Sequence, residues 1–431
     1  MRKLQRKEHV GGVIMDEYIV GIDISSSKVC GVVGSLDKYN EVQITGITTS
    51  DYCGIKDEVT VDSGEMSYVI KGVLSRLEEI VGSPLKKVYV SIPISLCEVV
   101  KTKGVISFPQ AKEIAKEDIE NVCEVAKFSV GKDKELIQVD IEEYIVDDMH
   151  NISNPMGMKG KLLQSEGNAF ILSNKYVNLY KDCLKKIDVE IEGWIVNSIG
   201  MSKDILTIDE LENGVALIDV GNSSMEATVF NKGRFIDFLS VPLGGKNITN
   251  DISICLKLSL ADSERLKVKC NTLLKDKSTE GHRIKINTEN GQCIDVNHEL
   301  LVDVIRERVK ELLEIIDGQL QKEGIDKQIQ SYVIVGGGIA LFRDIVVVGN
   351  DVMGKPVRIG IPNYVGAANP VYATATGILN NVLKKKIIFN DTNKQDEDLE
   401  LVEEHSHKND NKIMTMIKRV FKGFSNEEVI K

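Results

Sequence analysis

The sequence predicts an α/β protein built from two similar halves, and three observations support this. Short apolar runs typical of buried strands alternate with longer charged segments that have helical periodicity. A strand, a turn of small residues and a second strand occur twice, about two hundred residues apart. A further buried strand, late in the chain, runs directly into three consecutive glycines.

Composition and charge exclude several classes of protein. The chain has 431 residues, of which 42% are apolar and 28% are charged, as in ordinary globular proteins. Its net charge of −11 argues against a nucleic-acid binder, because such proteins usually present a basic surface to phosphates. The eight cysteines include no CxxC pair, so neither a zinc knuckle nor a disulfide framework is expected.

The first half opens with two strands, Tyr18–Ile24 and Lys28–Gly34, joined by a turn of three serines. The first strand ends in Asp23, and the small residues after it leave backbone N–H groups that can converge on an anion. The elements expected next are a strand at Glu41–Ile47, an amphipathic helix at Met66–Val81 and a buried strand at Lys87–Ile92.

The second half repeats this pattern. Gly214–Val220 and Met225–Phe230 are the expected strands, residues 221–224 form the turn, and Arg234–Val241 follows as a third strand. Asp219 takes the place that Asp23 has in the first half. Two such turns that face each other can hold a phosphate chain, with both aspartates binding Mg²⁺ through water. The alternative for either turn is a simple reversal of the chain.

The glycine triplet follows the strand that starts at Tyr332. Gly336, Gly337 and Gly338 would let the backbone approach a flat ligand closely, and a tight strand-to-helix connection is the alternative. Two aspartate turns and a strand with three glycines, in this order, indicate a ligand-binding site much more specifically together than each does alone.

This set of motifs resembles the actin, sugar kinase and chaperone ATPase superfamily, and within it the FtsA family of bacterial cell division proteins. Three segments are similar to motifs of that family. They are Val20-Gly-Ile-Asp-Ile-Ser-Ser-Ser-Lys-Val, Asn154-Pro-Met-Gly-Met-Lys-Gly-Lys-Leu and Asp209-Glu-Leu-Glu-Asn-Gly-Val-Ala-Leu-Ile-Asp-Val-Gly. The resemblance covers nearly the whole chain, from about Tyr18 to Phe424.

The resemblance implies an actin/Hsp70-like fold with a nucleotide cleft between two duplicated α/β domains. An FtsA-type subdomain called 1C, inserted at 104–180, would contain a helix at Glu113–Lys127 and would contact other subunits of a filament and later division proteins. The other expected parts are a disordered leader at 1–14, subdomain 1A at 15–103 and 181–212, subdomain 2A at 213–245 and 331–389, and subdomain 2B at 246–330.

The cofactors implied by the resemblance are ATP and Mg²⁺. Asp23 and Asp219 would hold the metal through water. The residues expected to bind nucleotide are Asp23, Ser25, Ser26, Ser27, Lys28, Asp219, Gly221, Asn222, Ser223, Ser224, Glu264, Lys267, Gly336, Gly337 and Gly338. For Glu264 and Lys267, which would contact the ribose, an exposed helical ion pair is the alternative.

Departures from the family's motifs predict weak hydrolysis or none. Ser25 and Asn222 stand where the family has glycine, and Glu226 extends a family aspartate by one methylene. Asn197 stands where active relatives place a Gln or Glu that orients the attacking water. Because Asn is short and is not a base, we expect nucleotide to act mainly as a conformational ligand.

A strong helix is expected at Val302–Ile316, with apolar residues at helical spacing. On it, Arg308 and Glu311 match the charged pair with which the family binds the C-terminal peptide of the tubulin-like protein FtsZ. A solvated charged face is the alternative for this pair.

The last part of the chain changes character twice. Residues 390–411 contain eight acidic residues and two lysines, a composition typical of a disordered linker. Residues 412–424 then separate into an apolar and a basic face, which favours a membrane-surface helix; docking on a partner is the alternative. The residues expected at the membrane are Ile413, Met414, Met416, Ile417, Lys418, Arg419, Val420, Phe421, Lys422 and Phe424.

These features together predict an ATP-binding, actin-like adaptor that forms filaments and tethers FtsZ to an anionic membrane surface. We expect it at the cytoplasmic face of the cell membrane, at the division septum, where it would help to recruit later division proteins. A pilus-assembly ATP-binding protein and a sugar-kinase-type phosphotransferase are the alternatives. The segment at Asn154 and the basic C-terminal helix favour the adaptor.

Overall fold

The computed structural model describes residues 18–52, 62–275, 281–288, 291 and 293–386. The predicted leader, acidic linker and amphipathic helix lie outside these residues. The chain divides into a first unit that ends at Leu383 and a second that begins at Lys384. The fold described below is that of the first unit.

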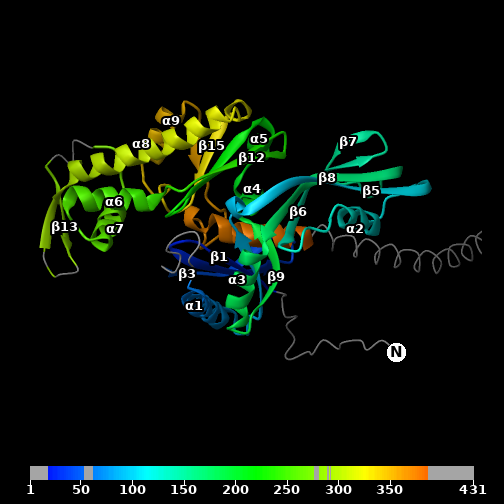
Figure 1. The fold of residues 1–431 in the computed structure, drawn as a ribbon, viewed down its shortest axis with the longest axis horizontal. Helices are drawn as coiled ribbons and strands as arrows, with labels where there is room; N and C mark the ends of the chain where they lie inside the picture. Colours follow the sequence, from blue (N-terminus) through cyan, green and yellow to red (C-terminus); the bar gives the residue numbers. More distant parts are fainter. Residues whose placement is uncertain (1–17, 53–61, 276–280, 289–290, 292, 387–431) are drawn as a thin grey trace, which may run out of the picture. The chain divides into compact units, whose positions relative to one another are not determined.

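Two five-stranded sheets with equivalent strand orders form the centre of the first unit (Figure 1). The first sheet has the order β3–β2–β1–β4–β9, and the second has the order β12–β11–β10–β15–β16. In each sheet, three antiparallel strands that follow one another in the chain precede two parallel ones. The sequence repeat is therefore confirmed as a duplication of a whole sheet.

Most predicted strands agree within two residues, but β3 extends four residues past its predicted end, and the edge strands β9 and β16 were not predicted. The first sheet contains β1 (Ile19–Ile24), β2 (Lys28–Leu36), β3 (Val42–Asp51), β4 (Lys87–Ile92) and β9 (Glu190–Val196). The second contains β10 (Val215–Val220), β11 (Met225–Asn231), β12 (Arg234–Val241), β15 (Ser331–Val335) and β16 (Val357–Ile359).

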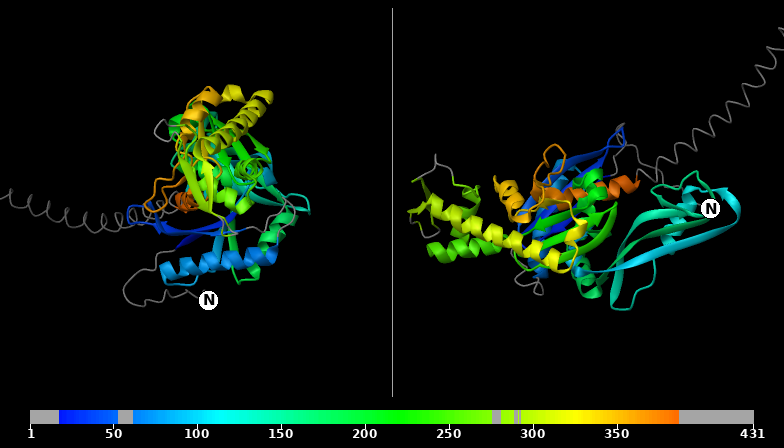
Figure 2. Two further views of the ribbon diagram at one scale, coloured as in Figure 1. Left: turned by 90° about the vertical axis from the view of Figure 1, so that its left-hand side faces the viewer. Right: turned by 90° about the horizontal axis from the view of Figure 1, so that it is seen from above.

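Helices cover the outer faces of the two sheets, with α1 and α8 on opposite sides (Figure 2). α1 (Ser63–Val81) starts where the Asp62 carboxylate accepts two backbone N–H groups, and it ends at Gly82. α8 (His298–Lys322) buries every apolar residue expected on its inner face. The remaining helices beside the sheets are α3 (Asn174–Lys185), α4 (Asn197–Ile205), α5 (Ile208–Asn213) and α9 (Ile345–Met353).

A helix that begins at residue 373 returns to the first sheet. Its Ile378 and Leu379 pack with Ile19 and Val32 in one buried cluster. The sequence places this segment in subdomain 2A, whereas in the structure its apolar face completes the core of the first half.

An inserted four-stranded sheet follows the short helix η1 (Ile94–Leu96) and has the order β5–β8–β6–β7. Its elements are β5 (Cys97–Glu113), α2 (Lys116–Val125), β6 (Lys134–Val146), β7 (Met149–Ile152) and β8 (Lys159–Ser173). α2 packs on this sheet through Ile119 and Val122. The helix is shorter than predicted, because residue 113 still pairs with β8 as part of β5.

A second group of elements lies between β12 and β15 in the chain. It consists of α6 (Gly245–Leu256), α7 (Leu260–Lys269), the hairpin β13 (Arg283–Asn287) and β14 (Cys293–Asn297), and α8. Glu264 and Lys267 both lie on α7. The exact boundaries of the four subdomains stay predictions.

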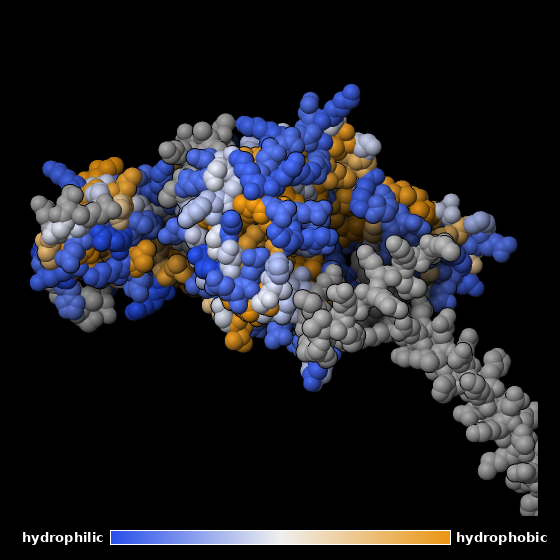
Figure 3. Space-filling view, turned by 90° about the horizontal axis from the view of Figure 1, so that it is seen from below, coloured by the Kyte–Doolittle hydropathy of each residue, from blue (hydrophilic) through white to orange (hydrophobic). Residues whose placement is uncertain are grey.

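The face of the molecule drawn in Figure 3 is mostly hydrophilic, with apolar side chains in separate patches. In the described part of the chain, no helix is both long enough and apolar enough to span a bilayer.

Candidate functional site

The turns of the two repeated hairpins line one cavity of about 560 Å³. Asp23, Ser25 and Ser26 line it from the first half. From the second half, Asp219 lines it together with Gly221, Asn222, Ser223 and Ser224. The structure thus brings together the two turns that the sequence selects, although about two hundred residues separate them in the chain.

The two turns close in the same way. The N–H of Ser25 donates to the carbonyl of Lys28 at 2.9 Å, and the N–H of Gly221 donates to the carbonyl of Ser224 at 2.9 Å. In both cases the donor lies two residues after the aspartate and the acceptor lies three residues further on. Ser25 therefore keeps the turn conformation that its glycine counterpart has in the second half.

The two aspartates sit where a charged ligand would be held. Burial raises the pKa of Asp23, and a 2.6 Å hydrogen bond from the Ser91 hydroxyl opposes this. Burial, followed by the nearby carboxylates of Glu226 and Asp23, raises the pKa of Asp219 to about 7. A divalent cation between the turns would favour the ionised form of both aspartates.

Asp23 and Asp219 are the acidic side chains that the two turns bring to the cavity. Among the described residues, no group of three His, Cys, Asp or Glu side chains is placed to hold a metal ion. Mg²⁺ keeps several of its waters when it binds beside phosphates. Asp23 and Asp219 would therefore hold it through water.

The glycine triplet packs against the second turn rather than lining the cavity. The N–H of Gly338 donates to the Val220 carbonyl at 2.7 Å. A Cβ atom on Gly338 would lie 2.5 Å from the Gly221 carbonyl oxygen, and Gly336 has a φ of +87°. Only glycine allows both the close approach at Gly338 and the positive φ at Gly336. The triplet therefore fixes the position of the second turn.

Glu264 and Lys267 support the first turn of α6. The Lys267 ammonium pairs with Glu264 at 2.7 Å and donates to the Gly245 carbonyl at 3.2 Å. Lys267 is buried, which does not fit an exposed helical ion pair. Neither side chain lines the cavity.

Ser27 and Lys28 do not line the cavity either. The Lys28 ammonium donates to the Val371 carbonyl at 3.3 Å, in η4 (Pro370–Tyr372). Lys28 therefore links the first hairpin to the segment that follows the glycine triplet.

A buried carboxylate that lines the cavity joins the two halves. Glu226 of β11 accepts hydrogen bonds from the Ser95 N–H at 3.2 Å, from the Ser95 hydroxyl, and from the Asn197 amide at 2.8 Å. The Asn197 oxygen in turn accepts the N–H of Ile94 at 3.0 Å. Asn197, which the sequence places at the position of the water-orienting Gln or Glu, therefore forms hydrogen bonds to Glu226 and Ile94. We call this group of contacts the Glu226 clasp.

Several lining residues carry no motif and are missed by sequence reasoning. The most informative is Lys246, in the first turn of α6, because it adds a cation to the N-terminal end of a helix, a place that favours anions. The signal in the sequence is the Gly244-Gly245-Lys246 step before a helical pattern. The others include Ser95, Asn247, Asn250 and Thr374, the prolines Pro93 and Pro242, and the more apolar side chains Met66, Leu96, Tyr176, Leu179 and Tyr180.

Arg308 and Glu311 lie on α8, away from this cavity. Arg308 forms a two-pronged ion pair with Asp251 of α6, including a 3.0 Å contact, and also pairs with Glu311. The hydrogen bonds that the Arg308 guanidinium donates to Asp251 raise its pKa. Arg308 therefore also holds α6 and α8 together through its ion pair with Asp251.

Two sheets of equivalent strand order, with a turn from each on a shared cavity, define an actin-like fold. Solved structures agree with this assignment. A chain of the PilM–PilN type IV pilus biogenesis complex superposes with a TM-score of 0.55 at 14% identity, covering 85% of this chain and 98% of that one. At this identity the likeness shows the fold alone.

The sequence comparisons are more specific. A family model described as the SHS2 domain inserted in FtsA matches residues 95–170, which include most of the four-stranded sheet, and the model for cell division protein FtsA matches residues 216–377. FtsA of Bacillus subtilis (strain 168) is 30% identical, over 84% of this chain and 83% of its own length. FtsA of Streptococcus pneumoniae (serotype 2, strain D39) is also 30% identical, over 83% and 78%. The chain belongs to the FtsA family of cell division proteins.

Proposed function

We propose that this protein binds ATP with Mg²⁺ in the cavity between its two halves and acts as a membrane adaptor for FtsZ. In this proposal it polymerises like actin, and α8 binds the C-terminal peptide of FtsZ. Residues 412–424 bind anionic lipid at the cytoplasmic face of the membrane, at the division septum. The inserted sheet contributes to filament contacts and helps to recruit later division proteins.

The observation that carries the proposal is the convergence of the two aspartate turns on one cavity. Asp23 and Asp219 supply carboxylates for a hydrated metal ion, the small residues of both turns supply backbone N–H groups, and Lys246 adds a positive charge. The match to the inserted domain of FtsA favours this family's role over that of the pilus proteins that share the fold.

The protein is proposed to bind nucleotide without rapid turnover. The Asn197 amide donates to Glu226 at 2.8 Å, and its oxygen accepts the Ile94 N–H. Because Asn197 is short, is not a base and is held by these contacts, it is not expected to activate an attacking water. Steady phosphate release of several molecules per minute from the pure protein would contradict this part of the proposal.

Co-sedimentation with vesicles tests the adaptor role. The full chain, with ATP and Mg²⁺, should bring FtsZ down with vesicles that contain anionic lipid, whereas FtsZ alone should stay in solution. Removal of residues 412–431 should release both proteins from the vesicles, since the predicted amphipathic helix is then lost. Equal sedimentation of FtsZ with the shortened chain would contradict the proposal, and neutral vesicles serve as the lipid control.

A further inference from the structure

The β11–β12 hairpin extends from the cavity to the inserted sheet. At its cavity end, Glu226 pairs with Ser240 across the two strands. At its other end, Asn231 pairs with Arg234 around a tight turn in which Lys232 and Gly233 both have positive φ. At a strand rise of about 3.3 Å per residue, the hairpin connects points roughly 15–20 Å apart.

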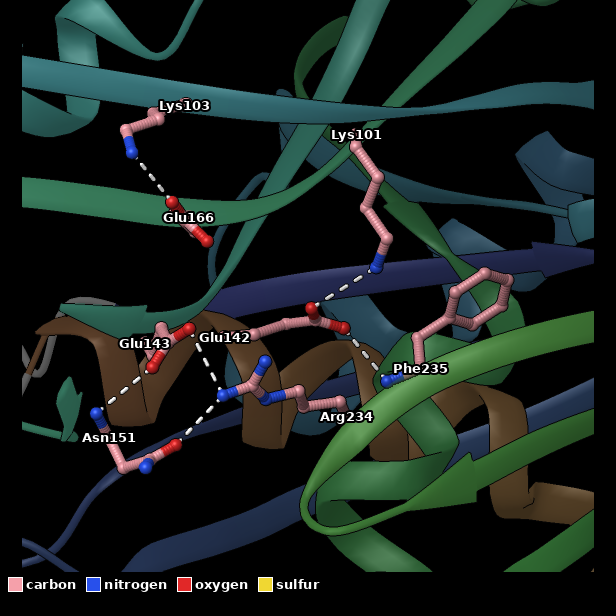
Figure 4. Close-up of polar contacts among 8 residues, drawn as sticks. All are labelled: Lys101, Lys103, Glu142, Glu143, Asn151, Glu166, Arg234 and Phe235. Carbon is pink, nitrogen blue, oxygen red and sulfur yellow. Dashed lines mark hydrogen bonds and ion pairs between the residues drawn. The ribbon is translucent and has the colours of Figure 1, made fainter. Parts of the chain in front are cut away.

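The far end of the hairpin is held by two adjacent carboxylates of β6 (Figure 4). The backbone N–H of Phe235 donates to Glu142 at 2.8 Å. The Arg234 guanidinium contacts Glu143 at 3.0 Å and the Asn151 side-chain oxygen at 2.8 Å. The Asn151 N–H donates to Glu143 at 3.0 Å. We call these contacts the inserted-sheet latch.

The local backbone explains how both carboxylates reach the hairpin. Adjacent residues on a regular strand point to opposite faces, but the pairing of β6 with β8 shifts between Ile141 and Glu143. Both side chains are largely buried, at 9% exposure for Glu142 and 7% for Glu143. Removal of only one partner of a buried ion pair leaves the other charge uncompensated. Substitution of Arg234 alone should therefore destabilise the folded chain.

An aromatic contact adds to the latch. The ring of Phe235 meets Phe170 of the inserted sheet edge-to-face at 6.2 Å, and it meets Phe230 of its own hairpin in the same way at 6.2 Å. The hairpin of the second half is therefore attached to the insertion of the first half by both polar and apolar contacts.

The near end of the same hairpin carries the Glu226 clasp. Ser95, which holds Glu226, lies in η1, and β5 of the inserted sheet starts two residues later. The phosphate turn at 221–224 leads directly into Met225, the first residue of β11. Any ligand that moves this turn must therefore move a stiff two-stranded element whose other end is latched to the insertion.

We propose that the β11–β12 hairpin couples occupancy of the phosphate turns to the attachment of the inserted sheet, through the Glu226 clasp at one end and the Arg234–Glu143 latch at the other. This inference rests on the proposed function in so far as the ligand is ATP with Mg²⁺. Binding draws the second turn and Glu226 toward the ligand, and the latch loosens. The inserted sheet is then freer to change its contacts.

Two backbone amides report directly on the latch, since the N–H groups of Phe235 and Asn151 donate to its carboxylates. Hydrogen–deuterium exchange of the full chain should become about threefold faster or more in peptides containing these amides when ATP and Mg²⁺ are added. Residues 221–224 should become protected in the same experiment. Glu226→Gln should accelerate exchange at the two amides without any nucleotide, because it weakens the clasp.

Two variants separate coupling from general loosening. Arg234→Ala combined with Glu143→Gln removes the Arg234–Glu143 ion pair without leaving Glu143 as an unpaired buried charge, while Glu142 keeps its pairing with Lys101 and the bond from Phe235. The Asn151 amide should therefore exchange faster in this variant, and neither reporter amide should show the wild-type response to nucleotide. Lys203→Ala is the matched control. It removes an ion pair between β6 and α4, within the first half, and should keep the nucleotide response of the wild type.

The outcomes distinguish this inference from the proposed function. Protection of 221–224 with unchanged exchange at Phe235 and Asn151 would overturn the coupling while supporting nucleotide binding. A full nucleotide response in the latch variant would also overturn it. If nucleotide protects nothing, the proposed function fails, and Glu226→Gln still decides the coupling: unchanged exchange at the two amides in that variant rejects it.

Discussion

The resemblance to the FtsA family predicts glycine at the positions of Ser25 and Asn222, and the structure explains how both turns form with these side chains. Neither residue has positive φ, so no left-handed conformation has to be tolerated there. Asparagine tolerates positive φ better than most residues, but Asn222 makes no use of this tolerance. The turns are instead held by the hydrogen bonds that Ser25 and Gly221 donate.

The glycine triplet offers a sharp test at single-residue scale. Gly338→Ala would place a Cβ atom 2.5 Å from the Gly221 carbonyl oxygen and 2.7 Å from the Val220 carbonyl oxygen. Both are backbone atoms, which cannot move aside as a flexible side chain can. We expect a loss of about 2 kcal/mol or more in the free energy of unfolding, together with weaker nucleotide binding. Chemical denaturation and a fluorescent-nucleotide titration measure the two effects.

Gly337→Ala is the control for this prediction. A Cβ atom there would meet only the Val371 side chain, at 3.6 Å, which is ordinary contact. Its stability should stay within about 0.5 kcal/mol of the wild type. Equal effects of the two alanines would show that the close approach of Gly338 to the second turn is not what matters.

At the scale of elements, the contact between α6 and α8 complicates the expected FtsZ-binding role of Arg308. Arg308→Glu should weaken binding of the FtsZ tail peptide at least about tenfold, if the guanidinium contacts the peptide. The same change places a carboxylate against Asp251 and so also repels α6. Fluorescence anisotropy of a labelled peptide measures the affinity.

Asp251→Asn separates the two effects. It removes the helix-joining ion pair but leaves the guanidinium available, so peptide affinity should stay close to that of the wild type. A similar loss in both variants would mean that Arg308 acts by holding α6 and α8 together. An unchanged affinity in Arg308→Glu would reject the assignment altogether.

Glu210 stabilises a junction between α5 and β16. Its carboxylate accepts from Arg358 at 2.6 Å and from the Thr207 N–H at 2.9 Å. Burial acts to raise the pKa of Glu210, but the hydrogen bonds from Arg358 and Thr207 outweigh it and hold the pKa below the ordinary 4.5. Since the pKa is depressed, this contribution to stability is present above pH 4.5 and is lost as pH falls through the folded-state value.

Glu210→Gln should therefore lower the free energy of unfolding by about 1–2 kcal/mol at pH 7, and by less in acid. Denaturation of both proteins at pH 7 and at pH 3.5 measures this. A difference between variant and wild type that stays the same at both pH values would contradict the role of the charged form.

At the scale of the whole molecule, local patterns predicted most of the fold. The strands of the two hairpins and the inner face of α8 follow from alternation and helical spacing, which are properties of short segments. The return of the helix at residue 373 to the first sheet was not predictable in this way. It depends on apolar contacts between residues such as Ile19 and Ile378, which lie far apart in the chain.

The same limit applies to the site. The two aspartate turns carry a motif and were found, whereas Ser95 and Lys246 reach the cavity only because distant elements pack together. Glu226 and Asn197 differ from the residues that the resemblance predicts, and their mutual contact depends on the packing of distant segments in the folded chain. Motifs thus locate the two aspartate turns, and tertiary packing determines what surrounds them.

The most direct test of the central claim is calorimetric titration of ATP with Mg²⁺ into the full chain, with Asp219→Asn as the comparison. We expect saturable binding at a single site that depends on Mg²⁺ and is at least about tenfold weaker in the variant. Absence of saturable binding, or equal affinity of the two proteins, would contradict the claim that the paired aspartate turns form a nucleotide site.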